Sequence, residues 1–477
     1  MQELYLLCVI LYWTVIFITA FQVLMDNRQP SKTVAWIMVM VFVPFVGWIF
    51  YMFFGISHRR ERLVSERSLN QLSKRQMLEF VEQHDLHVPP VYKPIIDLFI
   101  NQNLALPFGN NNLQIFREGD EFFLRLIADL GAAKSSIHLD MYIFEDDALG
   151  SLIADVLIDK VRQGVEVRVI YDDVGCWHVH ADFFERMREE GVEVVTFLPV
   201  RFPSFTSKVN YRNHRKLIII DGKVGYIGGM NIALRYIRGT RTQPWRDTML
   251  RLSGRSVYGL QRAFLVDWYF VDRTLISNHR YYPEMTEAPS PLLYHPLAQI
   301  VTSSPITPSP EIMQGYVRII MGAQKYVYME TPYFLPNEPV LFALKTAAKG
   351  GIDVRVMVPM YCDARFVDWA GRSFLREVAE SGVKVLLYKA GFLHSKILVS
   401  DDNLATCGST NVDFRSFENN FEGNAFLYDH DTAIGFRQLF ESDERQCIHL
   451  QQMDSRWHPR FFARLAESIL RLLAPLL

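Results

Sequence analysis

The sequence is poor in cysteine and almost neutral in charge, and each feature excludes classes of protein. Five cysteines are spread over 477 residues, with no C-x-x-C pair and no histidine at metal-ligand spacing. This pattern argues against a disulfide framework or a zinc site and indicates free thiols in a reducing compartment. The formal net charge is −2, so no global field favours nucleic acid as a partner. No carboxylate cluster suited to a divalent metal is present, and we expect neither a metal nor another cofactor.

Charged residues are also missing from two long apolar runs near the N-terminus. Residues 4–24 contain none and are long enough to cross a bilayer as a helix. Residues 34–56 form a second run that Pro44 interrupts, so a kinked or re-entrant segment stays open. A signal peptide is disfavoured because the first run lacks a basic leader and a small-residue cleavage site. We expect a membrane hairpin in residues 1–60, with helices at about 4–24 and 34–56.

Positive charge is concentrated directly after the second apolar run. Residues 59–75 contain six arginines and lysines against two glutamates. By the positive-inside rule this flank stays in the cytoplasm, which places the large C-terminal part on the same side. Two interpretations of this cluster are equally favoured. It contacts anionic lipid headgroups, or it forms a solvated helix whose charges only set the membrane topology. We assign residues 61–105 to a basic juxtamembrane segment and a proline-containing linker.

The rest of the chain contains one residue pattern twice. A histidine and a lysine lie two positions apart, so they project from the same face of a strand. An apolar run, an aspartate in a tight turn, a second strand and an asparagine follow. The offsets from the histidine are 2, 7 and 17 in both copies: His214 with Lys216, Asp221 and Asn231, and His394 with Lys396, Asp401 and Asn411. Agreement at four positions makes coincidence improbable.

The duplication extends beyond the histidines. Segments at 131–144, 165–171 and 192–197 have counterparts, in the same order, at 322–334, 352–358 and 382–388. Their alternation with helical segments predicts a parallel-rich α/β sandwich, and the period of roughly 180 to 190 residues is too long for a solenoid. Proline-rich stretches at 283–296 and 303–310 separate the halves. We therefore expect two similar α/β domains, 106–285 (motif 209–236) and 286–477 (motif 389–416), related by a pseudo-twofold axis.

The C-terminal residues 456–477 place charged and apolar side chains on different faces of a helix. This spacing predicts an amphipathic helix at the end of the second domain. Docking on the protein body is the commoner fate of such a helix. A position in the membrane interface is the alternative.

Two histidines that face one phosphate could divide the chemistry between them. One would attack phosphorus, while the other, protonated, would give a proton to the leaving oxygen. A hydroxyl group would then attack the phosphohistidine as the second histidine removes its proton. Lys216 and Lys396, helped by Asn231 and Asn411, would offset charge on the phosphate oxygens.

Each histidine needs an acceptor on its other ring nitrogen to fix its tautomer. Asp247 follows the first histidine by 33 positions and Glu422 follows the second by 28, both in apolar, strand-like stretches. We take them as candidate supports of the site, and a structural salt bridge is an equal alternative for each. Asp221 and Asp401 lie in turns past the strand, a position that indicates scaffold rather than substrate contact.

The paired H-x-K-x(4)-D motifs resemble the signature of the phospholipase D superfamily. The apolar N-terminus and segments such as PWRDTMLRL and GSTNVDFRSFENNFEGNA further resemble bacterial cardiolipin synthases, and the likeness covers nearly the whole chain. The resemblance implies reversible transfer of a phosphatidyl group between two phosphatidylglycerols through a phosphatidyl-histidine, giving cardiolipin and glycerol. It implies His214 as nucleophile, His394 as acid and base, and Asp221 and Asp401 as members of the catalytic signature. It also implies a multi-pass protein of the bacterial inner membrane with cytoplasmic catalytic domains.

Three alternatives use the same residues differently. A hydrolytic phospholipase D would accept water in place of a lipid hydroxyl, and the sequence leaves this open. A phosphodiesterase acting on nucleic acid needs a basic groove and has no need of membrane segments. A scaffold without activity is disfavoured by the intact pairs in both halves. We expect phosphatidylglycerol, other phospholipids and the bilayer as partners, and the sequence determines neither the acceptor lipid nor the oligomeric state.

Overall fold

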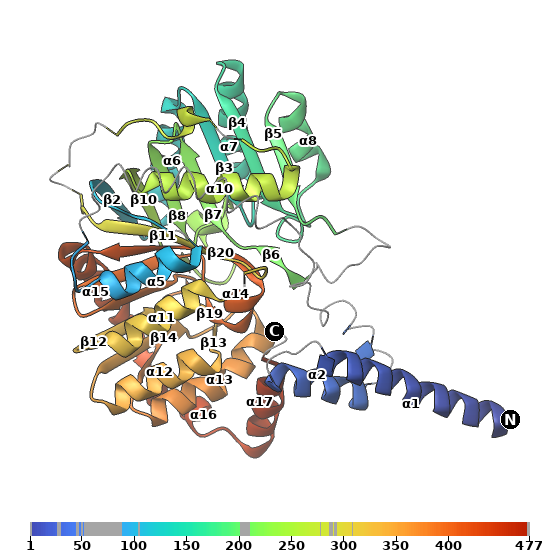
Figure 1. Cartoon of the computed structure of the whole chain (residues 1–477). Coiled ribbons are helices and arrows are strands. Elements are labelled where there is room, and N and C mark those ends of the chain that lie inside the picture. Colours follow the sequence, from blue (N-terminus) through green and yellow to red (C-terminus); the bar gives the residue numbers. More distant parts are fainter. Residues whose placement is uncertain are drawn as a thin grey trace.

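Two α/β units form the body of the protein, and two helices extend from it at the N-terminus (Figure 1). The computed structural model describes residues 2–25, 30–43, 47–48, 51, 88–103, 105–200, 210–276, 278–285, 290, 293–307 and 309–474. Each unit is built on one large sheet, and each sheet carries one of the two histidine motifs. The expectation of two similar α/β domains is confirmed.

The first sheet has seven strands in the order β2-β10-β8-β7-β3-β4-β5. Helices α6 (Gly119–Ala132), α7 (Ala148–Arg162) and α8 (Ala181–Glu189) share a hydrophobic core with one face of it, and α10 (Val257–Asp272) packs on the other. The strands are β2 (Asn111–Phe116), β3 (Ser136–Met141), β4 (Glu166–Asp172), β5 (Glu193–Phe197), β7 (Lys216–Ile220), β8 (Val224–Gly228) and β10 (Met249–Gly254).

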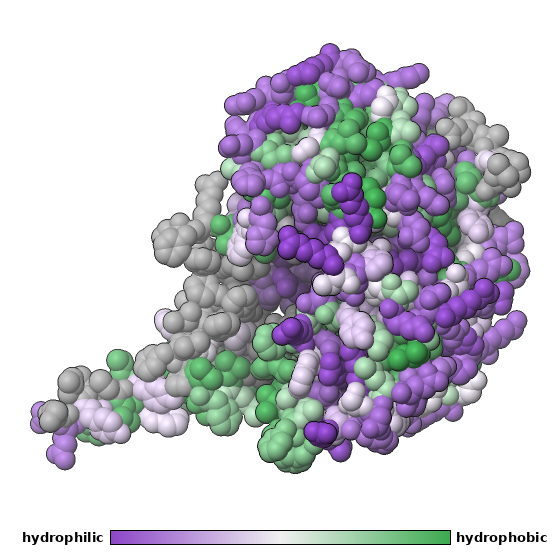
Figure 2. All heavy atoms as spheres, turned by 180° about the vertical axis from the view of Figure 1, so that it is seen from behind, coloured by the Kyte–Doolittle hydropathy of each residue, from purple (hydrophilic) through white to green (hydrophobic). Residues whose placement is uncertain are grey.

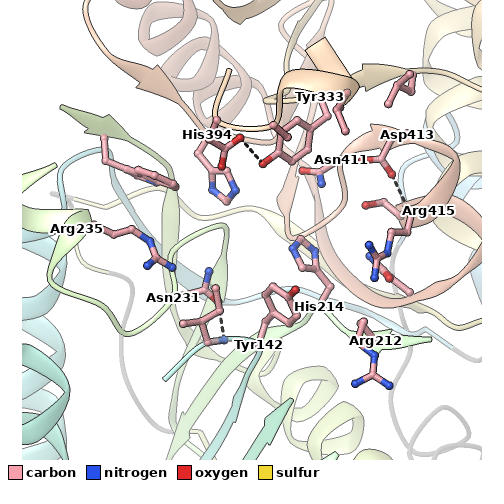
Figure 3. A pocket seen from close by; sticks show the side chains of 18 of the residues that line it. Tyr142, Arg212, His214, Asn231, Arg235, Tyr333, His394, Asn411, Asp413 and Arg415 are labelled. Atoms are coloured by element: carbon pink, nitrogen blue, oxygen red, sulfur yellow. Dashed lines mark hydrogen bonds between the residues drawn. The ribbon is translucent and has the colours of Figure 1, made fainter. Parts of the chain in front are cut away.

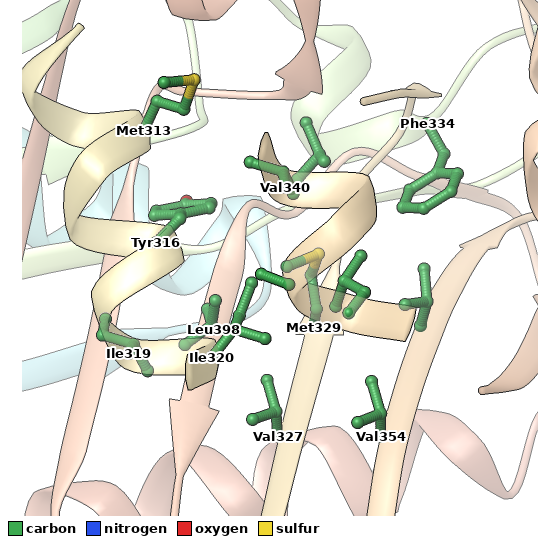
Figure 4. Packing of buried hydrophobic residues seen from close by; sticks show 14 of the residues in the cluster. Met313, Tyr316, Ile319, Ile320, Val327, Met329, Phe334, Val340, Val354 and Leu398 are labelled. Atoms are coloured by element: carbon green, nitrogen blue, oxygen red, sulfur yellow. The ribbon is translucent and has the colours of Figure 1, made fainter. Parts of the chain in front are cut away.

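The second sheet repeats this plan with additional edge strands, in the order β1-β11-β20-β18-β17-β12-β14-β15-β21. Helices α11 (Glu311–Gly322), α12 (Glu338–Lys349) and α13 (Arg365–Glu380) cover one face, and their residues Ile320 and Val340 share one hydrophobic cluster with Val327 and Val354 of the strands (Figure 4). Helix α15 (His430–Glu444) packs on the other face. The strands are β1 (Pro107–Phe108), β11 (Leu297–Ser303), β12 (Tyr326–Glu330), β14 (Asp353–Pro359), β15 (Lys384–Tyr388), β17 (Ile397–Ser400), β18 (Leu404–Gly408), β20 (Asn420–Tyr428) and β21 (Cys447–His449).

The sheets are less parallel than the sequence pattern indicates. Only β3-β4-β5 and β12-β14-β15 run parallel along the main path of each sheet, and the other neighbours on these paths are antiparallel. The expectation of a parallel-rich sandwich is therefore wrong. Each histidine strand turns back at once through a tight turn, where Asp221 and Asp401 adopt positive φ angles of 54° and 56°. A hairpin of this kind forces antiparallel pairing.

Several short elements join the two units. Strand β6 (Arg212–Asn213) pairs with β20 of the second sheet, and β9 (Trp245–Arg246) pairs with β16 (Phe392–Leu393). Helix α5 (Lys93–Asn103) precedes the first sheet in the chain but packs with the second unit, where Phe99 contacts Phe426 with ring centroids 4.5 Å apart. One hydrophobic core contains residues of both sheets together with α10 and α15. These contacts hold the two motif hairpins in a defined relation.

The N-terminal helices α1 (Gln2–Met25) and α2 (Pro30–Phe42) lie outside this body (Figure 1). In the described part of the chain, no helix meets the length and apolar character required for a membrane span. The expected transmembrane hairpin therefore stays a prediction, and the second apolar run lies partly outside the described residues. The basic segment at residues 59–75 lies wholly outside them.

The C-terminal helix α17 (Phe461–Leu473) docks on α13 through its charged side. Glu467 is buried and forms an ion pair with Arg376, and Arg471 pairs with Glu377. Leu470 packs against the core of the second unit, whereas five other large apolar side chains of this helix are exposed: Phe461, Phe462, Leu465, Ile469 and Leu472. Most of the apolar face of this amphipathic helix is therefore left uncovered by the protein.

Candidate active site

The two motif histidines lie just before the first strand of their hairpins, and each is bound by backbone to the opposite unit. The N–H of His214 donates to the carbonyl of Phe421 at 2.9 Å, and the N–H of His394 donates to the carbonyl of Arg246 at 2.7 Å. The crossed strand pairs β6–β20 and β9–β16 lead into these bonds. The position of each imidazole therefore depends on both halves of the chain.

Both histidines line one cavity of about 560 Å³, together with Asn231 and Asn411 (Figure 3). Aromatic rings hold the imidazoles in place. The ring of Tyr142 lies 4.9 Å from that of His214, and the ring of Trp245 lies 5.2 Å from that of His394. The amide oxygen of Asn231 accepts from the N–H of Ile143 at 3.1 Å, whereas the amide oxygen of Asn411 is buried without a hydrogen-bond partner among the described residues.

Each histidine has a carboxylate on Nδ1, and the carboxylate comes from the other half. The oxygens of Glu422 lie 3.0 and 3.1 Å from Nδ1 of His214, and Oδ2 of Asp247 lies 2.6 Å from Nδ1 of His394. Sequence order suggested the opposite pairing, because each acid follows the histidine of its own half. An acceptor on Nδ1 places the proton there and leaves the lone pair on Nε2 for chemistry.

The motif lysines are buried beside the histidines rather than in the cavity wall. The Lys216 ammonium donates to the carbonyl of His214 at 2.6 Å, and the Lys396 ammonium lies 2.9 Å from Nδ1 of His394 and donates to its carbonyl. Burial lowers the pKa of Lys216 to about 7 and that of Lys396 to about 8. The carboxylates Glu422 and Asp247 oppose this shift.

Burial also keeps the two imidazoles neutral at physiological pH. It lowers the pKa of His214 to about 4, against the opposing charge of Glu422. It lowers the pKa of His394 to about 3, and Lys396 adds to this effect. A neutral imidazole with a free Nε2 is a nucleophile, and a phosphodiester anion bound between the rings would favour protonation of one of them.

The motif aspartates lie in the hairpin turns, away from the cavity. The carboxylate of Asp221 accepts from the backbone N–H groups of residues 134–136, at 2.6 to 2.9 Å for the shortest contact of each. The carboxylate of Asp401 accepts from the equivalent N–H groups of residues 324–326, at 2.7 to 2.9 Å. The structure therefore brings the histidines, lysines, asparagines and supporting acids together and leaves these two carboxylates outside.

Replacing either turn aspartate is expected to reduce stability more than chemistry. Asp221→Ala leaves backbone donors without their charged acceptor and puts alanine at a positive φ angle, so we expect unfolding to become easier by about 2–4 kcal/mol. Asp221→Asn keeps an acceptor and tolerates this φ angle, so its loss should be smaller. Denaturant unfolding and the specific activity of the folded fraction measure the two effects. A rate loss above about 100-fold in fully folded Asp221→Asn would assign the carboxylate a catalytic role.

Sequence reasoning missed three arginines of the cavity wall, Arg212, Arg235 and Arg415, and the aromatic residues around the histidines. For two of these arginines, the sequence contains a signal that could have identified them. Arg235 follows His214 by 21 positions and Arg415 follows His394 by the same number. The offset extends the repeated pattern by one more residue in each half.

Comparison with known proteins places this site in a family. The family model "Cardiolipin synthase, PLD-like domain" matches residues 126–245 and 316–444, and the model "Phospholipase_D-nuclease N-terminal" matches residues 9–55. Cardiolipin synthase 2 of Bacillus anthracis is 38% identical over 473 residues, which cover 97% of this chain and 90% of that protein. The chain belongs to the cardiolipin synthase family. The major cardiolipin synthase of Bacillus subtilis (strain 168) is another relative, 35% identical over 469 residues and covering 95% of each chain.

A solved structure supports the fold of this family member. The phosphatidylserine synthase of Haemophilus influenzae Rd KW20 aligns with a TM-score of 0.59 and 14% identity, covering 80% of this chain and 100% of that one. At this identity the likeness concerns the fold alone. It supports the fold of two α/β domains, which the family model describes as PLD-like.

Proposed function

We propose that this protein is a cardiolipin synthase, which transfers a phosphatidyl group from one phosphatidylglycerol to the hydroxyl of a second. The observation that carries this proposal is the cavity in which two neutral histidines face each other, each with a carboxylate from the other half on Nδ1. Family membership along nearly the full chain supports the same reaction. The arrangement contains a nucleophile and a separate acid and base for one phosphorus atom.

In the proposed first step, Nε2 of His214 attacks phosphorus of the donor lipid. The bond from phosphorus to the glycerol oxygen breaks, and His394, protonated in the bound complex, gives its proton to that oxygen. In the second step, His394 removes the proton of the acceptor hydroxyl while the oxygen attacks phosphorus and the phosphorus–nitrogen bond breaks. The products are cardiolipin, glycerol and the starting enzyme, and every bond change is reversible.

The remaining motif residues have supporting roles in this proposal. Glu422 and Asp247 stabilise the positive charge that develops on each imidazole, as a buried carboxylate does in a catalytic triad. Lys216 and Lys396 supply positive potential from behind the histidines. The amides of Asn231 and Asn411 face the cavity and are placed to contact phosphate oxygens. Asp221 and Asp401 anchor the hairpin turns.

We further propose that the apolar surfaces at one end of the molecule hold the enzyme at the bilayer. Helix α1 exposes large apolar side chains along its length, and the exposed face of α17 adds two phenylalanines. Figure 2 shows hydrophobic residues gathered along the lower edge of the body, beside the N-terminal helices. An exposed apolar surface of this size is typical of contact with membrane or protein. The proposal retains the hairpin at residues 1–60 as a multi-pass anchor of the inner membrane with cytoplasmic catalytic domains.

The proposed domain boundaries follow from the sequence division. They assign residues 61–105 to the juxtamembrane segment and linker, 106–285 to the first domain and 286–477 to the second. Helix α5 at the end of the linker and β1 at the start of residues 106–285 both pack with the second unit, which supports assigning these two elements to it.

Product analysis tests the proposed reaction directly. Purified protein in phosphatidylglycerol vesicles is expected to form cardiolipin and free glycerol in equal amounts, measured by mass spectrometry of the lipids and enzymatic assay of glycerol. Phosphatidic acid as the main product would assign the site to hydrolysis instead. Vesicles of phosphatidylcholine alone serve as the control for lipid background.

The pKa values predict how the rate depends on pH. The value of kcat/KM reports the free enzyme, and both lysines lose their charge as the pH rises through about 7 and about 8. We therefore expect kcat/KM to fall as the pH rises through about 7 and about 8, and to fall in acid as the pH drops through about 4, where the nucleophile His214 becomes protonated. Phosphatidylglycerol has no group that titrates in the alkaline range, so initial rates between pH 4 and 9 isolate the enzyme. A rate that rises steadily to pH 9 contradicts the need for charged lysines.

A further inference from the structure

Two arginines occupy equivalent places in the two halves of the cavity. Arg235 and Arg415 each follow a motif histidine by 21 positions, and both line the cavity wall. In Figure 3 they lie at opposite ends of the cavity, with the two histidines between them. The duplication has thus put one guanidinium on each side of the pair of histidines.

The charge of Arg235 is already neutralised within the protein. Its guanidinium forms an ion pair with Glu145 and lies over the rings of Tyr236 and Trp245, at 5.7 and 5.5 Å from their centroids. Tyr236 and Trp245 themselves line the cavity. These partners fix the side chain and leave it little net attraction for an anion.

Arg415 lacks the corresponding partner. The position equivalent to Glu145 in the second half is occupied by Leu335, and the guanidinium of Arg415 has no carboxylate within ion-pair distance among the described residues. The equivalence of the two positions follows from matching bridges, Phe144 with Ile232 and Phe334 with Val412. A leucine therefore replaces the acid that would have neutralised this end.

Arg212 adds a second guanidinium to this end of the cavity, beside two acids that accept hydrogen bonds from other groups. Burial and the charge of Arg415 both lower the pKa of the neighbouring Arg212, whose own partner Asp172 is 3.4 Å away. The nearest acid on the same turn, Asp413, accepts from the N–H of Ser416 at 2.6 Å, and burial raises its pKa. Asp363, the other acid of the lining, accepts from the hydroxyl of Tyr333 at 2.9 Å. The charge of Arg415 opposes the rise in the pKa of Asp413, but neither acid forms an ion pair with this guanidinium among the described residues.

We propose that the Arg415 end of the cavity is a second phosphate subsite, which binds the phosphodiester of the lipid that accepts the phosphatidyl group. This inference depends on the proposed function. An acceptor phosphatidylglycerol carries its own phosphodiester at the far end of a three-carbon glycerol, so a second anion must lie close to the reacting phosphorus. A guanidinium matches two phosphate oxygens with paired hydrogen bonds. Water and free glycerol have no such group.

The subsite selects the acceptor without taking part in bond exchange. The acceptor oxygen still bonds to phosphorus, the phosphorus–nitrogen bond still breaks, and the proton still passes to the second histidine. Arg415 holds the phosphate of the acceptor and thereby positions its hydroxyl. The same subsite would hold the second phosphate of cardiolipin when the reaction runs backward.

Two assays on the same vesicles separate this role from catalysis. Cardiolipin formation requires an acceptor with a phosphate, whereas exchange of isotope-labelled glycerol into phosphatidylglycerol uses an acceptor without one. For Arg415→Gln we expect the ratio of cardiolipin formation to glycerol exchange to fall by about 10- to 100-fold, the loss expected for a charge-assisted hydrogen bond. Arg415→Lys keeps the charge and should recover part of the ratio.

Arg235→Gln is the matched control, because it makes the same chemical change at the equivalent position with a neutralised charge. We expect it to leave the ratio within about twofold of the wild type, whatever it does to the absolute rates. The proposal is overturned if Arg415→Gln lowers both assays equally or if Arg235→Gln, rather than Arg415→Gln, changes the ratio. Failure of the proposed function has a different signature, a wild-type protein that makes phosphatidic acid and no cardiolipin.

Discussion

His214→Ala and His394→Ala are each expected to lower cardiolipin formation by at least about 10³-fold, because a single imidazole cannot be both nucleophile and acid for the same phosphorus atom. The two rings line one cavity, and each has its own carboxylate from the opposite half. The effects of residues that act as one unit are not additive, so the double variant should be little less active than either single variant. Mass spectrometry of the lipids formed from phosphatidylglycerol measures all three.

The control is His430→Ala, which changes an exposed histidine whose ring binds the backbone carbonyl of Asp402. This variant should retain the wild-type rate, and all variants should remain folded and partition with the membrane. Near-normal activity in either motif variant would falsify the two-histidine mechanism. The variants also separate the two roles. A variant lacking the acid and base but keeping the nucleophile should still form the phosphohistidine from a donor with a good leaving group.

Asp247→Asn and Glu422→Gln are each expected to lower the rate by about 10²- to 10⁴-fold, the loss typical of a carboxylate that fixes a catalytic histidine tautomer. The amide nitrogen presents a donor to Nδ1, so the imidazole proton moves to Nε2 and the nucleophilic lone pair is lost. Because the pairing is crossed, Asp247→Asn should alter the role of His394, and Glu422→Gln the role of His214. The dependence of kcat/KM on pH identifies which imidazole has changed.

Glu330→Gln is the matched control for these amides. Glu330 is buried on β12, and burial raises its pKa to about 8, so the carboxyl is mostly protonated at neutral pH. Glutamine copies a neutral carboxyl closely, and we expect the rate at pH 7 to stay within a few-fold of wild type. If Glu330→Gln loses as much activity as Asp247→Asn, the loss reflects disturbed packing rather than a wrong tautomer.

Much of the site was visible in the chain before any coordinates. The repeat of His214 and Asn231 in the second half, at equal offsets, predicted residues that meet in the cavity, and the repeated Lys216 lies buried beside its histidine. Turn chemistry placed Asp221 and Asp401 outside it, because a short hairpin points its turn away from the start of its first strand. These inferences succeed because strand periodicity and tight turns are local and follow from neighbouring residues.

The relation between the halves could not be obtained in this way. Asp247 is near His214 in sequence order but lies on His394, because β9 pairs with β16 and carries it across the interface. The parallel-rich sheet was mispredicted for a related reason, since hydrophobic runs of buried strands look alike in either direction.

The sequence by itself determined which side chains form the site and that each motif residue occurs twice. A duplicated local pattern can be recognised without knowing which residues it contacts. The tertiary structure decided which acid serves which histidine, that burial keeps both rings neutral, and that Arg415 alone of the two equivalent arginines lacks a salt bridge among the described residues. Each of these depends on contacts between residues far apart in the chain. Burial and charge pairing are properties of the assembled interior, and no single stretch of sequence contains them.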